Sequence, residues 1–318
     1  MKNNNLFAHI SVFAANLIYG INYTVAKDVM PEFVTPNGFI LIRVLGAVIL
    51  FWSLSIIMGS SEKVERKDWT RIALAGLFGV AINQLFFFQG LSLTTPINAA
   101  IIMTINPVLV LIIAAIVLRN KITSTKTAGI LLGLSGAVLL TVYKNGELVI
   151  PSFSQDTVLG DMLVLVNAAS YALYLVIVKP LMEKYKPVTI VKWIFTFGLV
   201  GVFPFGIGEI VQFDWANFPA YIYGEIAFVV VGTTFFAYLF NMYGLKKLSP
   251  SVVSIYIYLQ PFLATLFAIA WGSDSLSLSQ VMAAALVFCG VYLVSKKPKA
   301  PSSMAAKLLL IPIDKESN

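Results

Sequence analysis

The sequence predicts an all-α polytopic membrane protein of ten transmembrane helices, arranged as two inverted five-helix repeats. Three observations lead to this prediction: an apolar composition, a succession of membrane-length apolar segments, and a second half that repeats the first. Of the 318 residues, 58% are hydrophobic and 12% are charged, with a mean hydropathy of +0.86. Soluble domains carry about 25% charged residues, and their interior cannot hide this much apolar surface. Lipid is therefore the expected solvent.

The predicted helices are apolar segments of about 20 residues, the length that crosses a bilayer. They lie near residues 8–27, 37–58, 69–90, 96–118, 124–143, 158–178, 188–211, 221–244, 250–271 and 279–295. The first segment could be a signal peptide, but Asn16, Tyr19 and Asn22 interrupt its apolar core and many spans follow it. We interpret it as a helix of the mature protein. The polar residues 296–318 predict a flexible cytosolic tail.

The basic residues predict the orientation of the chain. If the N-terminus is cytosolic and the segments alternate, 19 of the 22 Lys and Arg residues fall on the cytosolic side, and both termini are cytosolic. This is the bias that orients membrane proteins. The exceptions are Lys27, Arg43 and Lys144, whereas Lys192 is among the residues counted as cytosolic. The formal charge of +7 is thus a topology signal, and nucleic acid is not an expected partner.

The composition argues against an enzyme. Cys289 is the single cysteine and His9 the single histidine, so a disulfide, a zinc site and a histidine triad are not expected. Four carboxylates that could serve buried proton or sodium sites all fall near the ends of predicted helices: Asp161, Glu209, Glu225 and Asp274. We therefore predict no metal and no cofactor.

The two halves match at an offset of 154 residues. The informative matches are Gly90 with Gly244, Pro96 with Pro250 and Pro107 with Pro261, because Gly and Pro have backbone roles. Near the start of each half the offset is 152, where Tyr19 meets Tyr171 and Lys27 meets Lys179. Five helices are an odd number, so the second repeat, 158–295, must enter the membrane upside down relative to the first, 8–143. Inverted repeats are a transporter architecture with sites near the midplane.

The prolines Pro107 and Pro261 are predicted to bend their helices near the membrane midplane. Each removes the donor for a carbonyl four residues earlier, at Met103 or Ile257. We expect the preceding amide, Asn106 or Gln260, or water in a cavity, to satisfy that carbonyl. The alternative is a kink that only improves helix packing.

Polar side chains form stripes at helical spacing and should face inward, away from lipid. Stripes from both halves predict a shared polar cavity, although each stripe alone could simply fasten two helices together. The candidate substrate-binding residues are Asn16, Tyr19, Tyr23, Lys27, Arg43, Gln84, Asn106, Asn167, Tyr171, Tyr174, Tyr238, Asn241, Tyr258 and Gln260.

Arg43 is the one arginine inside a predicted span, about 9 Å from its outer end at 1.5 Å per residue. An intramembrane charge is a functional-site hypothesis by default. Together with Lys27, it could hold a carboxylate or phosphate of the substrate. The alternatives are that the long stem carries the charge out to the interface, or that it pairs with Asp28 or Glu32.

Several strings resemble those of a known family. They are LIYGINYTVAK, LIRVLGA and FFFQGLSLTTPINAAIIMTINPVLV in the first half, with LVNAASYALYLVIVKPL and FAYLFNMYGLKKLSPSVVSIYIYLQPFLATLFA in the second. The chain resembles the EamA-type transporters of the drug/metabolite transporter superfamily over nearly its whole length. The resemblance implies an inner-membrane metabolite carrier, often an exporter, that works by alternating access. The sequence departs from the family at Asn120 and Asp274, where members commonly have glutamate.

The leading functional prediction is a secondary transporter of small organic metabolites, such as amino acids or related solutes, acting as an exporter or facilitator. A carrier of nucleotide-sugars or phosphorylated metabolites, or a channel-like facilitator, remains an alternative. The expected partners are the small-molecule substrate and the lipid bilayer, and a monomer is compatible with the sequence.

Overall fold

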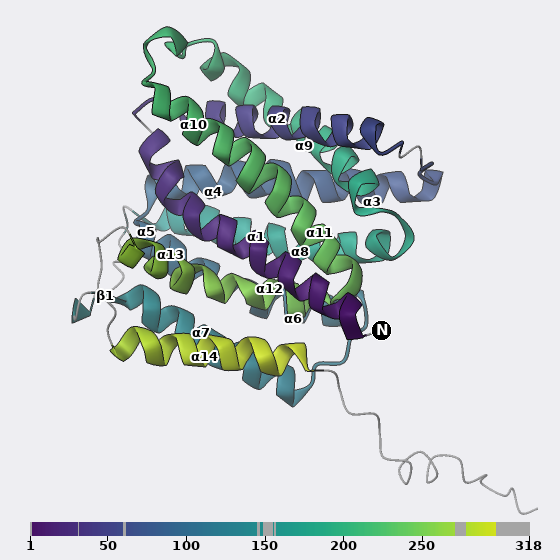
Figure 1. The fold of residues 1–318 in the computed structure, drawn as a ribbon, viewed down its shortest axis with the longest axis vertical. Helices are drawn as coiled ribbons and strands as arrows, with labels where there is room; N and C mark the ends of the chain where they lie inside the picture. The colour runs from purple at the N-terminus through teal and green to yellow at the C-terminus, as the bar shows by residue number, and fades with distance from the viewer. Residues whose placement is uncertain are drawn as a thin grey trace, which may run out of the picture.

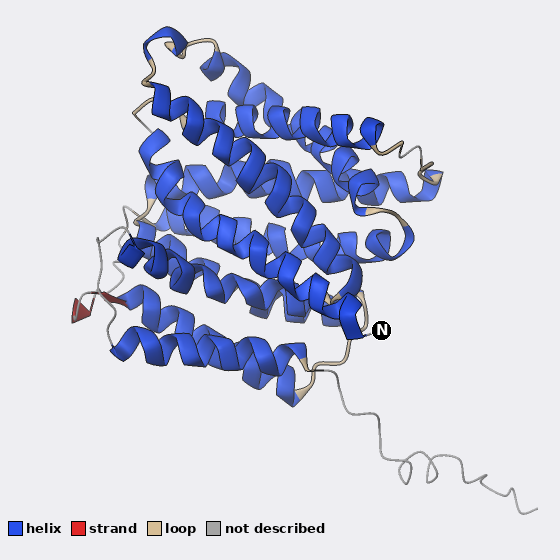
Figure 2. Ribbon diagram, viewed as in Figure 1, coloured by secondary structure: helices blue, strands red, loops and turns tan. Residues whose placement is uncertain are grey.

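A computed structural model describes residues 2–30, 32–59, 62–144, 147–148, 155, 157–270 and 278–296. In these residues the helices join into ten rods (Figures 1 and 2). Six rods are single helices: α1 (Lys2–Val29), α2 (Pro36–Ile57), α7 (Ser124–Val142), α8 (Val158–Lys184), α9 (Pro187–Ile210) and α14 (Leu278–Ser295). Two short strands, β1 (Tyr143–Lys144) and β2 (Glu147–Leu148), pair antiparallel after α7.

The other four rods are interrupted, which the sequence analysis did not predict for two of them. The third and eighth rods contain π-helical turns: α3 (Trp69–Gly76), η2 (Leu77–Ala81) and α4 (Ile82–Leu93), then α10 (Ala220–Phe228), η4 (Val229–Phe236) and α11 (Ala237–Lys247). The fourth and ninth rods are broken: α5 (Pro96–Met103) and α6 (Asn106–Val117), then α12 (Pro250–Ile255), the 3₁₀ turn η5 (Tyr256–Tyr258) and α13 (Leu259–Ala270). Short 3₁₀ turns, η1 (Arg66–Asp68) and η3 (Trp215–Asn217), precede the third and eighth rods.

The chain is a polytopic all-α membrane protein. In the described residues, seven helical spans are long and apolar enough to cross a bilayer, and Pro250–Leu263 and Gln280–Ser295 are shorter apolar helices. Large apolar side chains such as Ile57, Ile116 and Val211 are exposed on the outside of the bundle, as expected where lipid is the solvent.

The repeats are inverted. Figure 1 shows the N-terminus of α1 at one end of the bundle and β1, which follows the fifth rod, at the other end. The second repeat therefore starts from the opposite face. We call the face where α1 begins the N-terminal face. The α7–α14 and α2–α9 interfaces, each between counterpart helices, are the most extensive and lie on opposite sides of the bundle (Figure 1).

Close backbone contacts repeat from one half to the other. A Cβ at Gly90 in α4 would collide with Val164 in α8, and a Cβ at Gly244 in α11 would collide with Val12 in α1. Val12 is the counterpart of Val164 at the offset of 152, just as Gly90 is the counterpart of Gly244 at 154. The α1–α11 interface is thus a copy of the α8–α4 interface.

The same correspondence holds between α7 and α14. A Cβ at Gly129 would meet the carbonyl of Gly290 at 2.9 Å, and one at Gly136 would meet the carbonyl of Ala283 at 2.6 Å. Gly136 and Ala283 are the counterparts of Gly290 and Gly129 at the offset of 154. A pseudo-two-fold axis therefore passes between these two helices.

One charge counted in the orientation argument is buried in the bundle. Lys192, counted as cytosolic, lies within α9 and is 7% exposed. Its Nζ lies 2.8 Å from the Ser55 hydroxyl and 4.7 Å from the centre of the Trp52 ring. The hydroxyl and the indole face compensate the ammonium inside the bundle, which sequence spacing could not reveal. The tail beyond Lys296 lies outside the described residues.

Candidate functional site

Arg43 is buried at the centre of the bundle, with only 4% of its surface exposed. Its Nε donates to the Thr234 hydroxyl in η4 at 3.2 Å. Its guanidinium carbon lies 5.3 Å from the ring centre of Phe88 and 5.9 Å from that of Phe39. The arginine neither reaches the interface nor forms an ion pair with Asp28 or Glu32, because Thr234 and the two rings hold it inside the bundle.

Two tyrosines, Tyr19 and Tyr238, lie near this arginine, and Tyr171 and Tyr174 lie near those two. Tyr19 is close enough to interact electrostatically with Arg43 and with the phenols of Tyr171, Tyr174 and Tyr238. The Tyr171 and Tyr174 rings lie 5.9 Å apart, centre to centre. We call these five residues, with Gln84 and Asn241, the central cluster. It contains side chains of both repeats.

Gln84 and Tyr238 connect the repeats within the central cluster. Gln84 Nε2 donates to the Tyr238 hydroxyl at 2.8 Å, and the two residues are 154 positions apart. They are therefore counterparts of each other. A residue that contacts its own counterpart must lie on the pseudo-two-fold axis. Asn241 Nδ2 adds a 3.4 Å contact with the Tyr19 hydroxyl.

Thr104 and Tyr258 form a second pair of this kind. The Tyr258 hydroxyl donates to the Thr104 carbonyl at 2.9 Å, again across 154 positions. Thr104 lies in the break between α5 and α6, where the helical ladder is interrupted, and Tyr258 ends the 3₁₀ turn η5. The second repeat thus satisfies a carbonyl that the break leaves free, as an apolar interior requires.

The amides beside the prolines make hydrogen bonds to neighbouring helices. Asn106 Nδ2 donates to the Ala168 carbonyl in α8 at 2.9 Å, and not to Met103. Gln260 Nε2 donates to Asn16 Oδ1 in α1, also at 2.9 Å. Asn106 directly follows the turn at residues 104–105, and Gln260 follows the 3₁₀ turn η5. Both prolines fall in the first turn after a break, where a missing N–H is tolerated.

The two amide contacts are themselves counterparts. Asn106 corresponds to Gln260 at the offset of 154, and Ala168 corresponds to Asn16 at 152. In each repeat, therefore, one amide of the broken rod is hydrogen-bonded to the first helix of the other repeat: Asn106 to α8, and Gln260 to α1. We interpret Asn16, Asn106 and Gln260 as helix-positioning residues at the edge of the site.

The π-helical turns shape the site, and sequence analysis missed them. The Thr234 hydroxyl, which accepts from Arg43, itself donates to the Val229 carbonyl at 2.8 Å inside η4. On the other side, Asn167 Nδ2 donates to the Asn83 carbonyl at 2.6 Å, and Ser170 donates to the Phe78 carbonyl in η2. Side chains thus bind carbonyls that a π turn displaces, and π turns are frequent at functional sites.

Phe39 and Phe88 were also missed, since nothing in a sequence distinguishes an aromatic ring under a guanidinium from one facing lipid. The side chains of Tyr23 and Lys27, two predicted site residues, lie outside the described residues.

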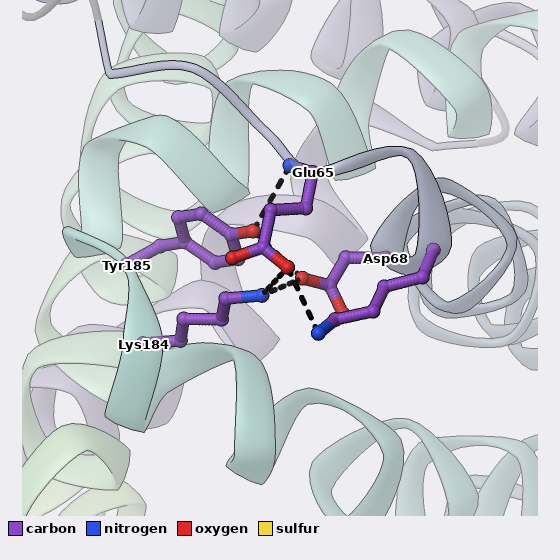
Figure 3. Close-up of polar contacts among 5 residues, drawn as sticks. Glu65, Asp68, Lys184 and Tyr185 are labelled. Carbon is purple, nitrogen blue, oxygen red and sulfur yellow. Dashed lines mark hydrogen bonds and ion pairs between the residues drawn. The ribbon is translucent and has the colours of Figure 1, made fainter.

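An ion-pair cluster joins the end of α8 to the turn η1 and the residue before it (Figure 3). Lys184 Nζ lies 2.6 Å from both Glu65 Oε2 and Asp68 Oδ2, and the Tyr185 hydroxyl donates to Asp68 Oδ2 at 2.6 Å. The hydrogen bond from Lys184, followed by that from Lys67, lowers the pKa of Glu65 below its ordinary value.

The opposite face has aromatic contacts at the corresponding place. Phe33, the counterpart of Tyr185 at the offset of 152, packs edge-on against Phe218 and Tyr221, with ring centres 5.9 and 6.4 Å apart. We call these three residues the aromatic cluster. Counterpart positions at the two faces therefore make different contacts: Tyr185 joins a cluster of ion pairs and hydrogen bonds, whereas Phe33 joins a group of aromatic rings.

Comparison with known proteins finds transporter relatives over nearly the whole chain. The family model described as the EamA-like transporter family matches twice, over residues 6–142 and 158–296. An uncharacterized transporter of Archaeoglobus fulgidus is 28% identical over 88% of this chain and 95% of its own length. The uncharacterized transporter YyaM of Bacillus subtilis is 26% identical over 95% and 97%.

More distant similarities cover most of the chain as well. The WAT1-related protein At3g53210 of Arabidopsis thaliana is 23% identical, over 87% of this chain and 79% of its own. One crystal structure, with 19% identity, superposes with a TM-score of 0.74 over 95% of this chain and 98% of its own.

Proposed function

Because the chain belongs to the EamA-like transporter family, we propose that it is a secondary carrier that moves small organic metabolites, such as amino acids or related solutes, by alternating access. It acts as an exporter or facilitator in the bacterial inner membrane, with both termini in the cytosol. The two moving units are residues 8–143 and 158–295.

The observation that carries this proposal is the pair of contacts between counterpart residues, Gln84 with Tyr238 and Thr104 with Tyr258. Both contacts are consistent with a pseudo-two-fold axis, and the first of them lies within the central cluster, to which both repeats contribute side chains. A carrier needs this arrangement, because opening toward one face and opening toward the other are then equivalent rearrangements around a fixed site. A channel has no use for two equivalent gates.

Counter-exchange in liposomes tests the proposal. Solutes that stabilise the purified protein against heat are chosen from a panel of amino acids, organic acids and phosphorylated metabolites. Each is then loaded, unlabelled, inside protein-containing liposomes. A carrier takes up the labelled solute faster into loaded than into empty liposomes, with saturation. Flux that rises linearly with concentration and ignores the loading would identify a channel instead.

A further inference from the structure

We infer that the central cluster binds the carboxylate of an organic monoanion with an apolar body of aromatic size, and that it disfavours zwitterions and dianions. The inference rests on the proposed carrier function and narrows its substrate class, away from amino acids and toward organic monoanions among the related solutes.

The first argument is that Arg43 has hydrogen-bond donors to spare. Its Nε is used by Thr234, so the two terminal amino groups of the guanidinium project from an anchored stem. The ion pairs among the described residues lie elsewhere and involve Lys67, Lys179 and Lys184. Two parallel N–H groups match the two oxygens of a carboxylate, which is how arginine binds that group most strongly.

The second argument is charge balance. Among the described ionisable groups, those near enough to Arg43 to influence its charge are the phenols of Tyr19 and Tyr238, and a phenol is uncharged at neutral pH. The central cluster therefore holds one positive charge and no carboxylate. A bound monoanion makes the closed site neutral. A zwitterion leaves one positive charge, and a dianion leaves one negative charge, and an uncompensated charge is costly away from water.

The third argument concerns the rest of the substrate. Phe39 and Phe88 lie at the guanidinium, and the rings of Tyr171, Tyr174 and Tyr238 lie beyond it. These surfaces favour an apolar or aromatic body by burial and ring contact. Among the described side chains of the central cluster, an ammonium group would meet phenol and amide oxygens and ring faces, and no carboxylate.

Four probes that share a phenyl ring and differ in charge test this inference. They are 3-phenylpropionate, phenylalanine, benzylmalonate and 2-phenylethylamine, which carry at pH 7 one negative charge, none net, two negative charges and one positive charge. The measurement is the concentration of each that gives half of the maximal thermal stabilisation of the purified full chain. We expect 3-phenylpropionate to act at the lowest concentration.

Variants locate the binding group. Arg43→Gln should raise the half-saturating concentration of 3-phenylpropionate by about 10- to 100-fold, the usual effect of losing charge-assisted hydrogen bonds. Arg43→Lys should recover only part of this loss, because it restores the charge and not the paired donors. Lys192→Gln is the matched control, since it removes another buried cation outside the central cluster and should leave the concentration unchanged.

The inference is overturned if phenylalanine or benzylmalonate equals 3-phenylpropionate, if none of the four probes stabilises the protein, or if both Arg43 variants bind like wild type. These outcomes are separable from failure of the carrier proposal. Saturable counter-exchange of some other solute with no monoanion preference would defeat only this inference. A clear preference without counter-exchange of any solute would defeat the carrier and leave the binding site.

Discussion

Gln84 and Tyr238 are hydrogen-bonded to each other at 2.8 Å, and each holds in its own repeat the position that the other holds in the second repeat. Such a contact is restricted to the axis that relates the repeats. It also lies within the central cluster, beside Arg43. One hydrogen bond therefore lies both on the axis that relates the repeats and within the central cluster. Its contribution to stability can be measured.

A double-mutant cycle on this pair should give a measurable coupling. Gln84→Leu and Tyr238→Phe each remove one partner, and together they should cost less stability than the sum of the single changes, by about 0.5–1.5 kcal/mol. Reversible unfolding in mixed micelles measures the free energies. The pair Ser135 and Tyr292, both exposed, on α7 and α14, and not hydrogen-bonded to each other, provides an additive control.

Tyr258→Phe should destabilise the protein by about 1–3 kcal/mol, because the Thr104 carbonyl at the helix break loses its donor in an apolar interior. The same unfolding measurement applies. Tyr292→Phe is the matched control: its side chain is 66% exposed and faces outward from α14. Equal effects of the two changes would show that the Thr104 contact contributes nothing.

Pro107→Ala or Pro261→Ala should give a folded protein whose counter-exchange is slowed. The new N–H can bond the carbonyl four residues earlier, joining the two pieces of a broken rod and stiffening an element that moves. Pro36→Ala, at the start of the unbroken helix α2, should leave the exchange rate unchanged. If all three variants transport at the wild-type rate, the breaks serve packing alone.

The orientation of the chain can be checked with an impermeant thiol reagent in a Cys289→Ala background, since Cys289 is exposed. A cysteine placed in residues 144–156 should react from outside intact cells, and one placed in residues 61–67 should react only after permeabilisation. The reverse pattern would place the N-terminal face outside the cell.

The ion-pair cluster should weaken in acid. The pKa of Glu65 is lowered from its ordinary value of 4.5, chiefly by the hydrogen bond from Lys184. A lowered pKa means that Glu65 contributes its stability above pH 4.5, where the carboxylate is charged in both states, and loses it as the pH falls through the lower, folded-state value. Thermal melting of wild type and Glu65→Gln should therefore differ at pH 7 and converge in acid. A constant difference would contradict this assignment.

Much of the fold follows from the sequence, because lipid solvent imposes long apolar segments and leaves few alternatives. Gly90 and Gly244 could be matched by spacing alone, and the contacts of both confirm the match. The π turns η2 and η4 could not be predicted. They lie in segments that are mostly apolar, so an extra residue in a helical turn does not change any visible hydrophobic pattern. The amide of Asn106 was assigned to the wrong carbonyl for a related reason: its direction depends on the turn at Thr104, which composition does not reveal.

The polar character of a residue predicted whether it lies in the central cluster, but it did not predict which partners it contacts there. Tyr19, Arg43 and Tyr238 were found because polar groups avoid lipid, and they do lie together. Their partners, Phe39 and Phe88, are apolar and gave no signal. The contact between Arg43 and Thr234 depends on the π turn as well, so only the folded chain reveals it.

The contacts on the axis also limit what a single repeat could build. In a dimer of two identical five-helix chains, each axial residue would face a copy of itself, glutamine against glutamine at position 84 and threonine against threonine at position 104. The fused chain is free of that constraint, and places tyrosine opposite each of them, at Tyr238 and Tyr258. Fusion of the halves thus allows an unlike donor and acceptor on the axis, and a lone arginine beside it instead of an obligatory pair of like charges.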